Sequence, residues 1–136
     1  MITTVKTNNS VTTQIIIGAF HKVYNSLGFG LVEKVYVNSL LRELKQRGLK
    51  CDTKHQIAVF YDDQEVGLYL ADIIVNDCII IEVIANEKIR KACENQLVDY
   101  LNFSDIDTGL ILNFGKKAAS RRKVLTSKNV NYRHEN

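Results

Sequence analysis

Acidic residues inside apolar strand segments are the first feature of this sequence that could support chemistry. The stretch ADIIVNDCIIIEVIANEK, residues 71–88, carries Asp72 and Glu82 among residues typical of buried strands. A carboxylate buried without a partner is energetically costly, so each acid requires some compensation. The structural alternatives are that Asp72 accepts backbone N–H groups and that Glu82 pairs with a nearby lysine.

A third acid, Glu33, lies in a segment with helical spacing. The apolar residues Tyr36, Leu40 and Leu44 follow it by three, seven and eleven positions. On a helix these offsets place Glu33 on the inner stripe or at its edge. Its structural alternative is a boundary residue that covers a helix end. We expect three carboxylates that point inward, which is more than core packing requires.

Converging carboxylates predict a metal site. Acids that share a water-accessible cleft repel one another unless a cation neutralises them. Hard oxygen ligands suit Mg²⁺ or Mn²⁺ better than zinc. Such a site can activate water and neutralise charge on a phosphoryl group, as phosphodiester hydrolysis requires. A zinc site is not expected, because Cys51 and His55 lack a second ligand pair.

The elements that must position these residues follow from hydrophobic periodicity. Apolar residues at helical spacing predict helices over 10–26, with Ser10 as N-cap, and over about 31–47. Short β-branched runs predict strands at 56–61, 67–75 and 78–84, in an antiparallel meander. Helical spacing returns over 86–103, where Gln96 and Tyr100 share one face, and 108–114 is a further buried strand. The order α-α-β-β-β-α-β predicts an α/β domain with a mixed sheet flanked by helices.

The turn between the second and third strands decides whether Asp72 and Glu82 can share a site. A regular two-residue loop at Asn76 and Asp77 would place Asp72 opposite Ile81. Glu82 would then project from the other face of the sheet, because side chains alternate along a strand. A shared site therefore requires a three-residue turn or a β-bulge, and we predict that irregularity.

Charge and cysteine content set the expected environment. The chain of 136 residues has a net charge of +3, but the segment 115–136 carries seven Lys or Arg against one acid. A basic segment on an acidic body is compatible with phosphate binding, and equally with a solvated tail.

Three cysteines without paired spacing indicate a reducing compartment. With no signal peptide or membrane span at the N-terminus, we expect a cytoplasmic, single-domain protein.

Several motifs resemble one known family. GLVEKVY, residues 30–36, matches the Gly-x-x-Glu-x-x-Tyr pattern of the small bacterial GxxExxY family. The resemblance extends over residues 11–125 and includes NQLVDYL and TGLILNFG. That family is similar to the PD-(D/E)xK nuclease superfamily, which implies a restriction-endonuclease-like α-β-β-β-α-β core over the single domain 1–136.

The resemblance also implies roles for individual residues. Asp72 and Glu82 would bind Mg²⁺ or Mn²⁺, Glu33 would be the helical acid, and Gln96 the accessory residue, with Tyr100 one turn away as support. The substrate would be DNA or RNA. Its phosphates would be contacted by residues of the basic segment, namely Lys116, Lys117, Arg121, Arg122 and Lys123.

The chain departs from the family pattern at one position. Where the pattern has Glu-x-Lys, the sequence reads Glu82, Val83 and Ile84. A well-placed acid–base group contributes about 10²–10⁴ in rate, so its loss could silence the enzyme without unfolding it. Lys88 is the preferred replacement, Lys54 is the second candidate, and the alternative for Lys88 is a solvated lysine.

Two functional hypotheses follow. The first is a metal-dependent nuclease, which is either impaired by Ile84 in place of the lysine or rescued by a lysine at another position. The second is a catalytically inactive nuclease fold that binds nucleic acid or a protein partner. A structural domain that forms a homodimer through its apolar first helix is a third possibility.

Overall fold

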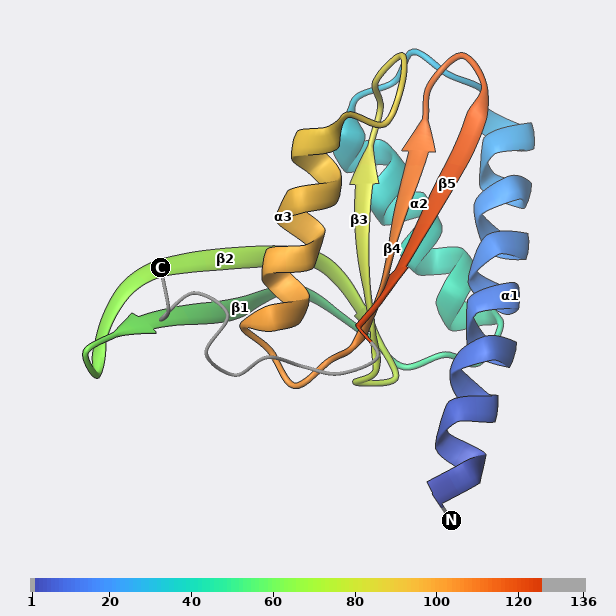
Figure 1. Ribbon diagram of the computed structural model, residues 1–136. Coiled ribbons are helices and arrows are strands. Elements are labelled where there is room, and N and C mark those ends of the chain that lie inside the picture. Colours follow the sequence, from blue (N-terminus) through green and yellow to red (C-terminus); the bar gives the residue numbers. More distant parts are fainter. Residues whose placement is uncertain (1, 126–136) are drawn as a thin grey trace.

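The computed structural model describes residues 2–125, with side chains from residue 9 onward, as eight elements around one sheet (Figure 1). The sheet has the strand order β1-β2-β3-β4-β5, in which β3 and β4 are parallel and the other neighbours antiparallel. The predicted α/β architecture with a mixed sheet is confirmed. The elements are α1 (Ile2–Leu27), α2 (Glu33–Gln46), β1 (Cys51–Tyr61), β2 (Gln64–Val75), β3 (Ile79–Ile84), α3 (Lys91–Asn102), β4 (Thr108–Phe114) and β5 (Ala118–Val124).

Helices cover both faces of the sheet. On one face, α1 and α2 pack on alternate residues of β3 and β4. On the other face, α3 packs on the intervening residues. Every residue of β4 is buried, as expected for a strand covered on both faces. Ile81 and Ile80 illustrate the alternation, since the first belongs to the α1–α2 cluster and the second to the α3 cluster.

Several predicted boundaries were wrong. Helix α1 begins at Ile2 rather than at residue 10, so Ser10 lies within the helix and is not its N-cap. Helix α3 begins at Lys91 rather than at residue 86, after a loop that includes Lys88. Strand β1 begins at Cys51 rather than at residue 56, and β2 begins at Gln64 rather than at residue 67, because exposed polar residues in these strands hide the pattern.

The basic segment contains a strand that the sequence analysis missed. Residues 118–124 form β5, which pairs with β4 at the edge of the sheet. Glu94 of α3 holds this strand through ion pairs to Arg121 Nη1 at 3.0 Å and Lys123 Nζ at 2.7 Å. The segment is therefore not simply a tail, and its residues 126–136, with Lys128 and Arg133, lie outside the described part.

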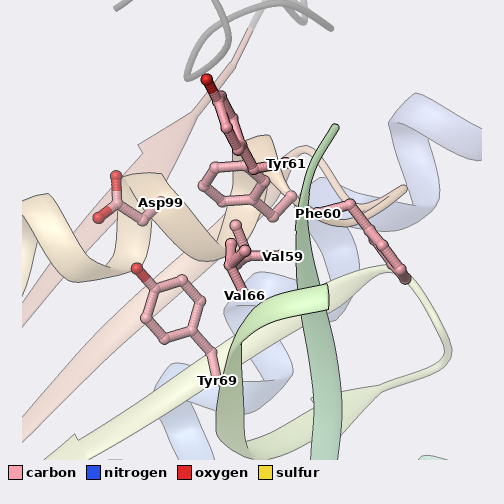
Figure 2. Close-up of a pocket in the computed structure, with 7 residues that line it drawn as sticks. Val59, Phe60, Tyr61, Val66, Tyr69 and Asp99 are labelled. Carbon is pink, nitrogen blue, oxygen red and sulfur yellow. The ribbon is translucent and has the colours of Figure 1, made fainter. Parts of the chain in front are cut away.

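The β1–β2 hairpin projects from the sheet as a two-stranded arm, defined here as residues 55–61 and 64–71 (Figure 1). Strand β2 pairs with β3 only through residues 73–75, so along the arm it has β1 as its neighbour. The arm ends in a two-residue turn at Asp62 and Asp63, both with positive φ. A cavity of about 360 Å³ between the arm and α3 is lined by Val59, Phe60, Tyr61, Val66, Tyr69, Asp99 and Phe103 (Figure 2).

Among the described residues, no helix combines the length and the apolar character needed to cross a membrane.

Candidate active site

The turn between β2 and β3 has the predicted irregularity. Val75 pairs with Ile79, so three residues form the loop, and Asn76 and Asp77 adopt positive φ. Asparagine and aspartate tolerate this left-handed conformation better than most residues. The register continues with Ile73 opposite Ile81. The next pair in this register would be Asp72 opposite Glu82, and a shared site requires this arrangement.

The two acids lie where β2 and β3 separate, a place we call the fork. The backbone N–H of Val83 donates to Asp72 Oδ2 at 2.9 Å, and the N–H of Asp72 donates to Glu82 Oε2 at 3.0 Å. Each carboxylate thus satisfies a backbone donor of the opposite strand just beyond the last paired residues. Asp72 therefore accepts a backbone N–H group, which was the structural alternative for this residue. The same two hydrogen bonds also hold Asp72 and Glu82 close together.

The GxxExxY segment explains how Glu33 is positioned. Tyr36 is fully buried and stacks on Phe114 with ring centroids 4.3 Å apart. Its hydroxyl donates to the Gly28 carbonyl at 2.6 Å and accepts from the Leu31 N–H at 3.2 Å. Gly30 has φ +101°, a conformation that favours glycine. These contacts fix the loop before α2, so that Glu33 begins the helix at a defined point.

A cavity of about 450 Å³ lies beside the fork, between α2 and the base of the arm. Glu33 and Asp72 both line it, so the structure brings these two predicted residues together. Lys54 also lines the cavity and has φ +51°. It lies between the pairs Thr53–Ile73 and His55–Ala71, which places it beside Asp72 on the strand opposite β3. The remaining lining residues are Lys34, Val37, Asn38, Leu41 and Thr53.

Burial and mutual repulsion raise the pKa values of the fork acids. Burial, followed by the charge of Asp72, raises the pKa of Glu82 to about 8, and Glu33 adds to the repulsion. Burial also raises the pKa of Asp72, against the hydrogen bond from Val83. Tyr100 of α3 forms a hydrogen bond with Glu82, and burial together with the two carboxylates raises the pKa of its hydroxyl. The fork therefore favours either a bound proton or a bound cation.

The raised pKa of Glu82 predicts that stability falls with pH. The carboxyl group keeps its proton up to about pH 8 in the folded chain, whereas it ionises near 4.5 when exposed. The stabilisation is therefore complete below pH 4.5 and is lost as the pH rises towards 8. In metal-free buffer, the melting temperature of the Glu82→Gln variant should change less than that of the wild type between pH 5 and about pH 8, because glutamine cannot release a proton.

The matched control for this prediction is Glu65→Gln, which changes an exposed acid of the arm. This variant should keep the pH dependence of the wild type. Equal slopes for wild type and Glu82→Gln would show that Glu82 is ionised throughout the range, contrary to the prediction.

The donor set of the fork fits a hard divalent cation in type. Asp72 and Glu82 offer carboxylate oxygens, which Mg²⁺ and Mn²⁺ prefer, and their mutual repulsion would be relieved by positive charge. Within the described part of the chain, no three His, Cys, Asp or Glu side chains are arranged to hold a metal together. Water would therefore complete the coordination, as is usual for Mg²⁺.

The other predicted catalytic residues lie on β3 and on the elements that follow it. Gln96 is exposed on α3, one turn before Tyr100. Lys88 is exposed in the loop after β3, and this loop is fastened to β4 by a hydrogen bond from the Asn86 N–H to Asn113 Oδ1. Strand β4 lies on the side of β3 away from the fork. Ile84 is partly buried against the α3 cluster.

The predicted phosphate-binding residues form two groups. Lys116 and Lys117 are exposed in the β4–β5 turn, which Figure 1 places at the same end of the sheet as the loop before α2. Arg122 is also exposed, on β5. Arg121 and Lys123 instead form the ion pairs with Glu94 described above.

Two residues at the site were underestimated by the sequence analysis. Tyr100 was expected as a support one turn from Gln96, yet it is the α3 residue that contacts Glu82. Lys54 was ranked after Lys88, yet it shares the cavity with Glu33 and Asp72. Its neighbour relation to Asp72 depends on the β1–β2 register, which the hydrophobic pattern of β1 does not specify.

Comparison with known proteins agrees with this geometry. No curated protein matches the chain. The crystal structure of SSO0001 has a similar fold, with a TM-score of 0.51 and 17% sequence identity over 67% of this chain and 48% of that one. The chain thus spans about half the length of SSO0001. The family model described as PD-(D/E)XK nuclease superfamily matches residues 10–124. The chain belongs to the PD-(D/E)XK nuclease superfamily.

Proposed function

We propose that this protein is a metal-dependent nuclease that hydrolyses phosphodiester bonds in DNA or RNA. The observation that carries the proposal is the three-residue turn, which sets Asp72 opposite Glu82 at the fork in a domain of this superfamily. Gly30, Glu33 and Tyr36 support a place in the GxxExxY branch. The unpaired state of all three cysteines is compatible with the cytoplasm.

The fork residues have distinct proposed roles. Asp72 and Glu82 hold Mg²⁺ or Mn²⁺, which would neutralise phosphate charge and lower the pKa of attacking water. Tyr100 orients Glu82 through its hydrogen bond. Glu33, at the wall of the cavity, accepts a hydrogen bond from water, and Gln96 contacts the substrate backbone.

Lys54 and Lys88 are the two candidates for the cation that would replace the lysine of the Glu-x-Lys pattern. Lys54 lines the cavity with Glu33 and Asp72, which favours it. Lys88 was the stronger candidate from sequence, but its loop is fastened on the β4 side of β3. Both side chains are exposed and long, so mutagenesis can rank them directly.

Cleavage of end-labelled single- and double-stranded DNA and RNA tests the proposal. We expect product with Mn²⁺ or Mg²⁺ and none with EDTA. Binding without cleavage in every metal would support the second hypothesis, an inactive module. The specific observation favouring that alternative is Ile84, which packs against the α3 cluster where the family pattern has lysine.

Salt dependence tests the phosphate contacts. Replacing Lys116 and Lys117 by serine should weaken nucleic-acid binding and reduce the slope of log K against log salt by about 1.4–1.8, since each phosphate contact contributes about 0.7–0.9. The measurement is a fluorescence-anisotropy titration at several salt concentrations. The control replaces Lys45, near the C-terminal end of α2, and Lys50, directly before β1, and should leave the slope unchanged. Equal losses in both double variants would contradict these contacts.

A further inference from the structure

The cavity between the arm and α3 is lined mainly by aromatic side chains. Four of the seven described residues that line it are aromatic, namely Phe60, Tyr61, Tyr69 and Phe103. Asp99 is the one charged residue among the seven. None of these residues lines the cavity beside the fork. The volume of about 360 Å³ suits a small ligand or a single side chain.

A β-bulge in the arm shapes this cavity. Val59 pairs with Gly67 and Phe60 pairs with Glu65, so Val66 is an extra residue of β2 without a counterpart in β1. A bulge bends its strand and redirects the side chains around it. Three consecutive residues of β1, beginning with Val59, therefore line the cavity together, although the side chains of a regular strand would alternate between its two faces.

Ring contacts hold the inner wall of the cavity in place. Tyr69 packs against Tyr100 with ring centroids 5.0 Å apart, and against Phe103 with centroids 6.5 Å apart. Tyr69 and Phe103 are both partly buried against the α3 cluster. Tyr61 is instead 62% exposed, so its ring is accessible to a ligand. Figure 2 shows that Asp99 comes from α3, opposite the side chains of the arm.

The charges of the arm favour a cationic ligand. Asp62, Asp63 and Glu65 are the sequence neighbours of the lining residues at the tip. Residues 55–71, which include both strands of the arm and its turn, contain no Lys or Arg. An acidic surface of this kind attracts a positively charged group and repels the phosphates of nucleic acid.

The α3 side of the cavity has the same negative character. Residues 92–107, which include most of α3 and the loop after it, contain no Lys or Arg. Arg121 and Lys123 reach α3 from β5, but both form ion pairs with Glu94. Asp99 therefore faces the cavity without a basic residue among its lining residues.

A guanidinium group matches both the aromatic and the acidic parts of this cavity. Its flat face stacks on aromatic rings, and its edge donates two parallel hydrogen bonds to a carboxylate. The ammonium group of lysine is more strongly hydrated and has no flat face. A carboxylate accepts up to about four hydrogen bonds, so Asp99 can bind a ligand in addition to its contacts within the protein.

The open edge of β2 indicates that the guanidinium group belongs to a peptide. Along the arm β2 pairs with β1, whereas β3 pairs only with residues 73–75 of β2. Within the described part of the chain, residues 64–71 thus have one edge without a strand partner. An extended peptide can add to such an edge while a side chain enters a neighbouring pocket. Val66 and Tyr69 of the same strand line the cavity.

We propose that this cavity binds an arginine side chain of a protein partner. Asp99 accepts hydrogen bonds from the guanidinium group, which stacks on Tyr61 and Tyr69, and the partner's backbone adds to the free edge of β2. The site is separate from the fork and needs neither metal nor cleavage. Its failure would therefore leave the proposed nuclease function untouched.

An NMR titration of the ¹⁵N-labelled full chain tests the proposal. The probe is a seven-residue peptide of threonine and valine with one central arginine. We expect shifts of the resonances of the arm and of the C-terminal half of α3. The same peptide with citrulline, which is nearly isosteric but uncharged, should bind at least about 10-fold more weakly, since hydrogen bonds between charged groups are lost. Equal affinities for the two peptides would overturn the proposal.

A comparison with N-acetylarginine amide identifies the source of the guanidinium group. This compound carries the side chain without an extended backbone, so we expect it to bind more weakly than the arginine peptide. If it binds as tightly as the peptide, the cavity is a site for a small guanidino compound and the proposed protein partner is wrong.

Variants of the lining residues locate the site. Asp99→Asn should weaken binding of the arginine peptide at least about 10-fold, and Tyr61→Leu about 2–5-fold, as loss of an exposed cation–π contact does. The controls are Asp105→Asn and Phe29→Leu, which make matched changes at exposed residues outside the cavity and should bind like the wild type. Unchanged resonances elsewhere verify that each variant is folded. Wild-type affinity in folded Asp99→Asn and Tyr61→Leu would overturn the proposal.

Discussion

Replacing Asp72 with asparagine is expected to abolish the stabilisation of this protein by Mn²⁺. A ligand present at 100 times its dissociation constant stabilises the folded state by about 2.7 kcal/mol, which corresponds to a rise of roughly 10 °C in melting temperature for a domain of this size. Asp72→Asn removes one of the two carboxylates at the fork, so the rise should disappear. Cleavage should fall at least about 100-fold, more than the loss typical of an outer-shell partner.

The substitution is chosen to leave the fold intact. Asparagine retains a side-chain oxygen that can accept the hydrogen bond from the Val83 N–H. The control, Asp63→Asn, makes the same chemical change at the exposed tip of the arm and should respond to Mn²⁺ like the wild type. If Asp72→Asn is stabilised by Mn²⁺ as strongly as Asp63→Asn, the metal does not bind at the fork.

Introducing lysine at position 84 should raise cleavage by about 10²–10⁴-fold if the wild type lacks a cation at the reacting phosphate. Ile84 follows Glu82 by two residues on the same strand, so both side chains leave the sheet on the same face. The position is partly buried against α3, and a lysine stem can lie along that surface while its ammonium group extends towards the fork.

Three further variants interpret the result. Ile84→Met has a long side chain without charge and should not gain activity. Lys54→Ala should lower wild-type cleavage if Lys54 is the relocated cation, and Lys88→Ala should do so if that role belongs to Lys88. Equal rates for Ile84→Lys and Ile84→Met would show that charge at position 84 does not limit cleavage.

Register and turn chemistry explain why so much of the site could be predicted. The side chains of adjacent strand residues alternate, so Asp72 and Glu82 could share a site only with an irregular turn. Asn76 and Asp77 form that turn because their side chains tolerate positive φ. The helical offsets to Tyr36 and Leu40 predicted that Glu33 points inward, but Glu33 is the exposed first residue of α2, as its structural alternative at a helix end describes. Tyr36 anchors the loop before α2.

Other features depend on contacts that local sequence patterns do not contain. The sequence of β5 looks like an exposed basic segment. Its partner acid Glu94, which forms ion pairs with Arg121 and Lys123, is distant in the sequence. The start of α3 was misplaced because the loop before it contains residues that also suit a helix. Lys54 reaches the cavity through a positive φ within β1, where lysine has no special preference for that conformation.

Anomalous diffraction from crystals soaked in Mn²⁺ tests whether Asp72 and Glu82 bind a metal ion. We expect a peak at the fork for an ion bound by a carboxylate oxygen of Asp72 and one of Glu82, with water completing the coordination. The same soak of Asp72→Asn crystals should show no peak there. A wild-type fork without a peak under saturating Mn²⁺, with both acids still hydrogen-bonded to the opposite strands, would show that these acids do not form a metal site.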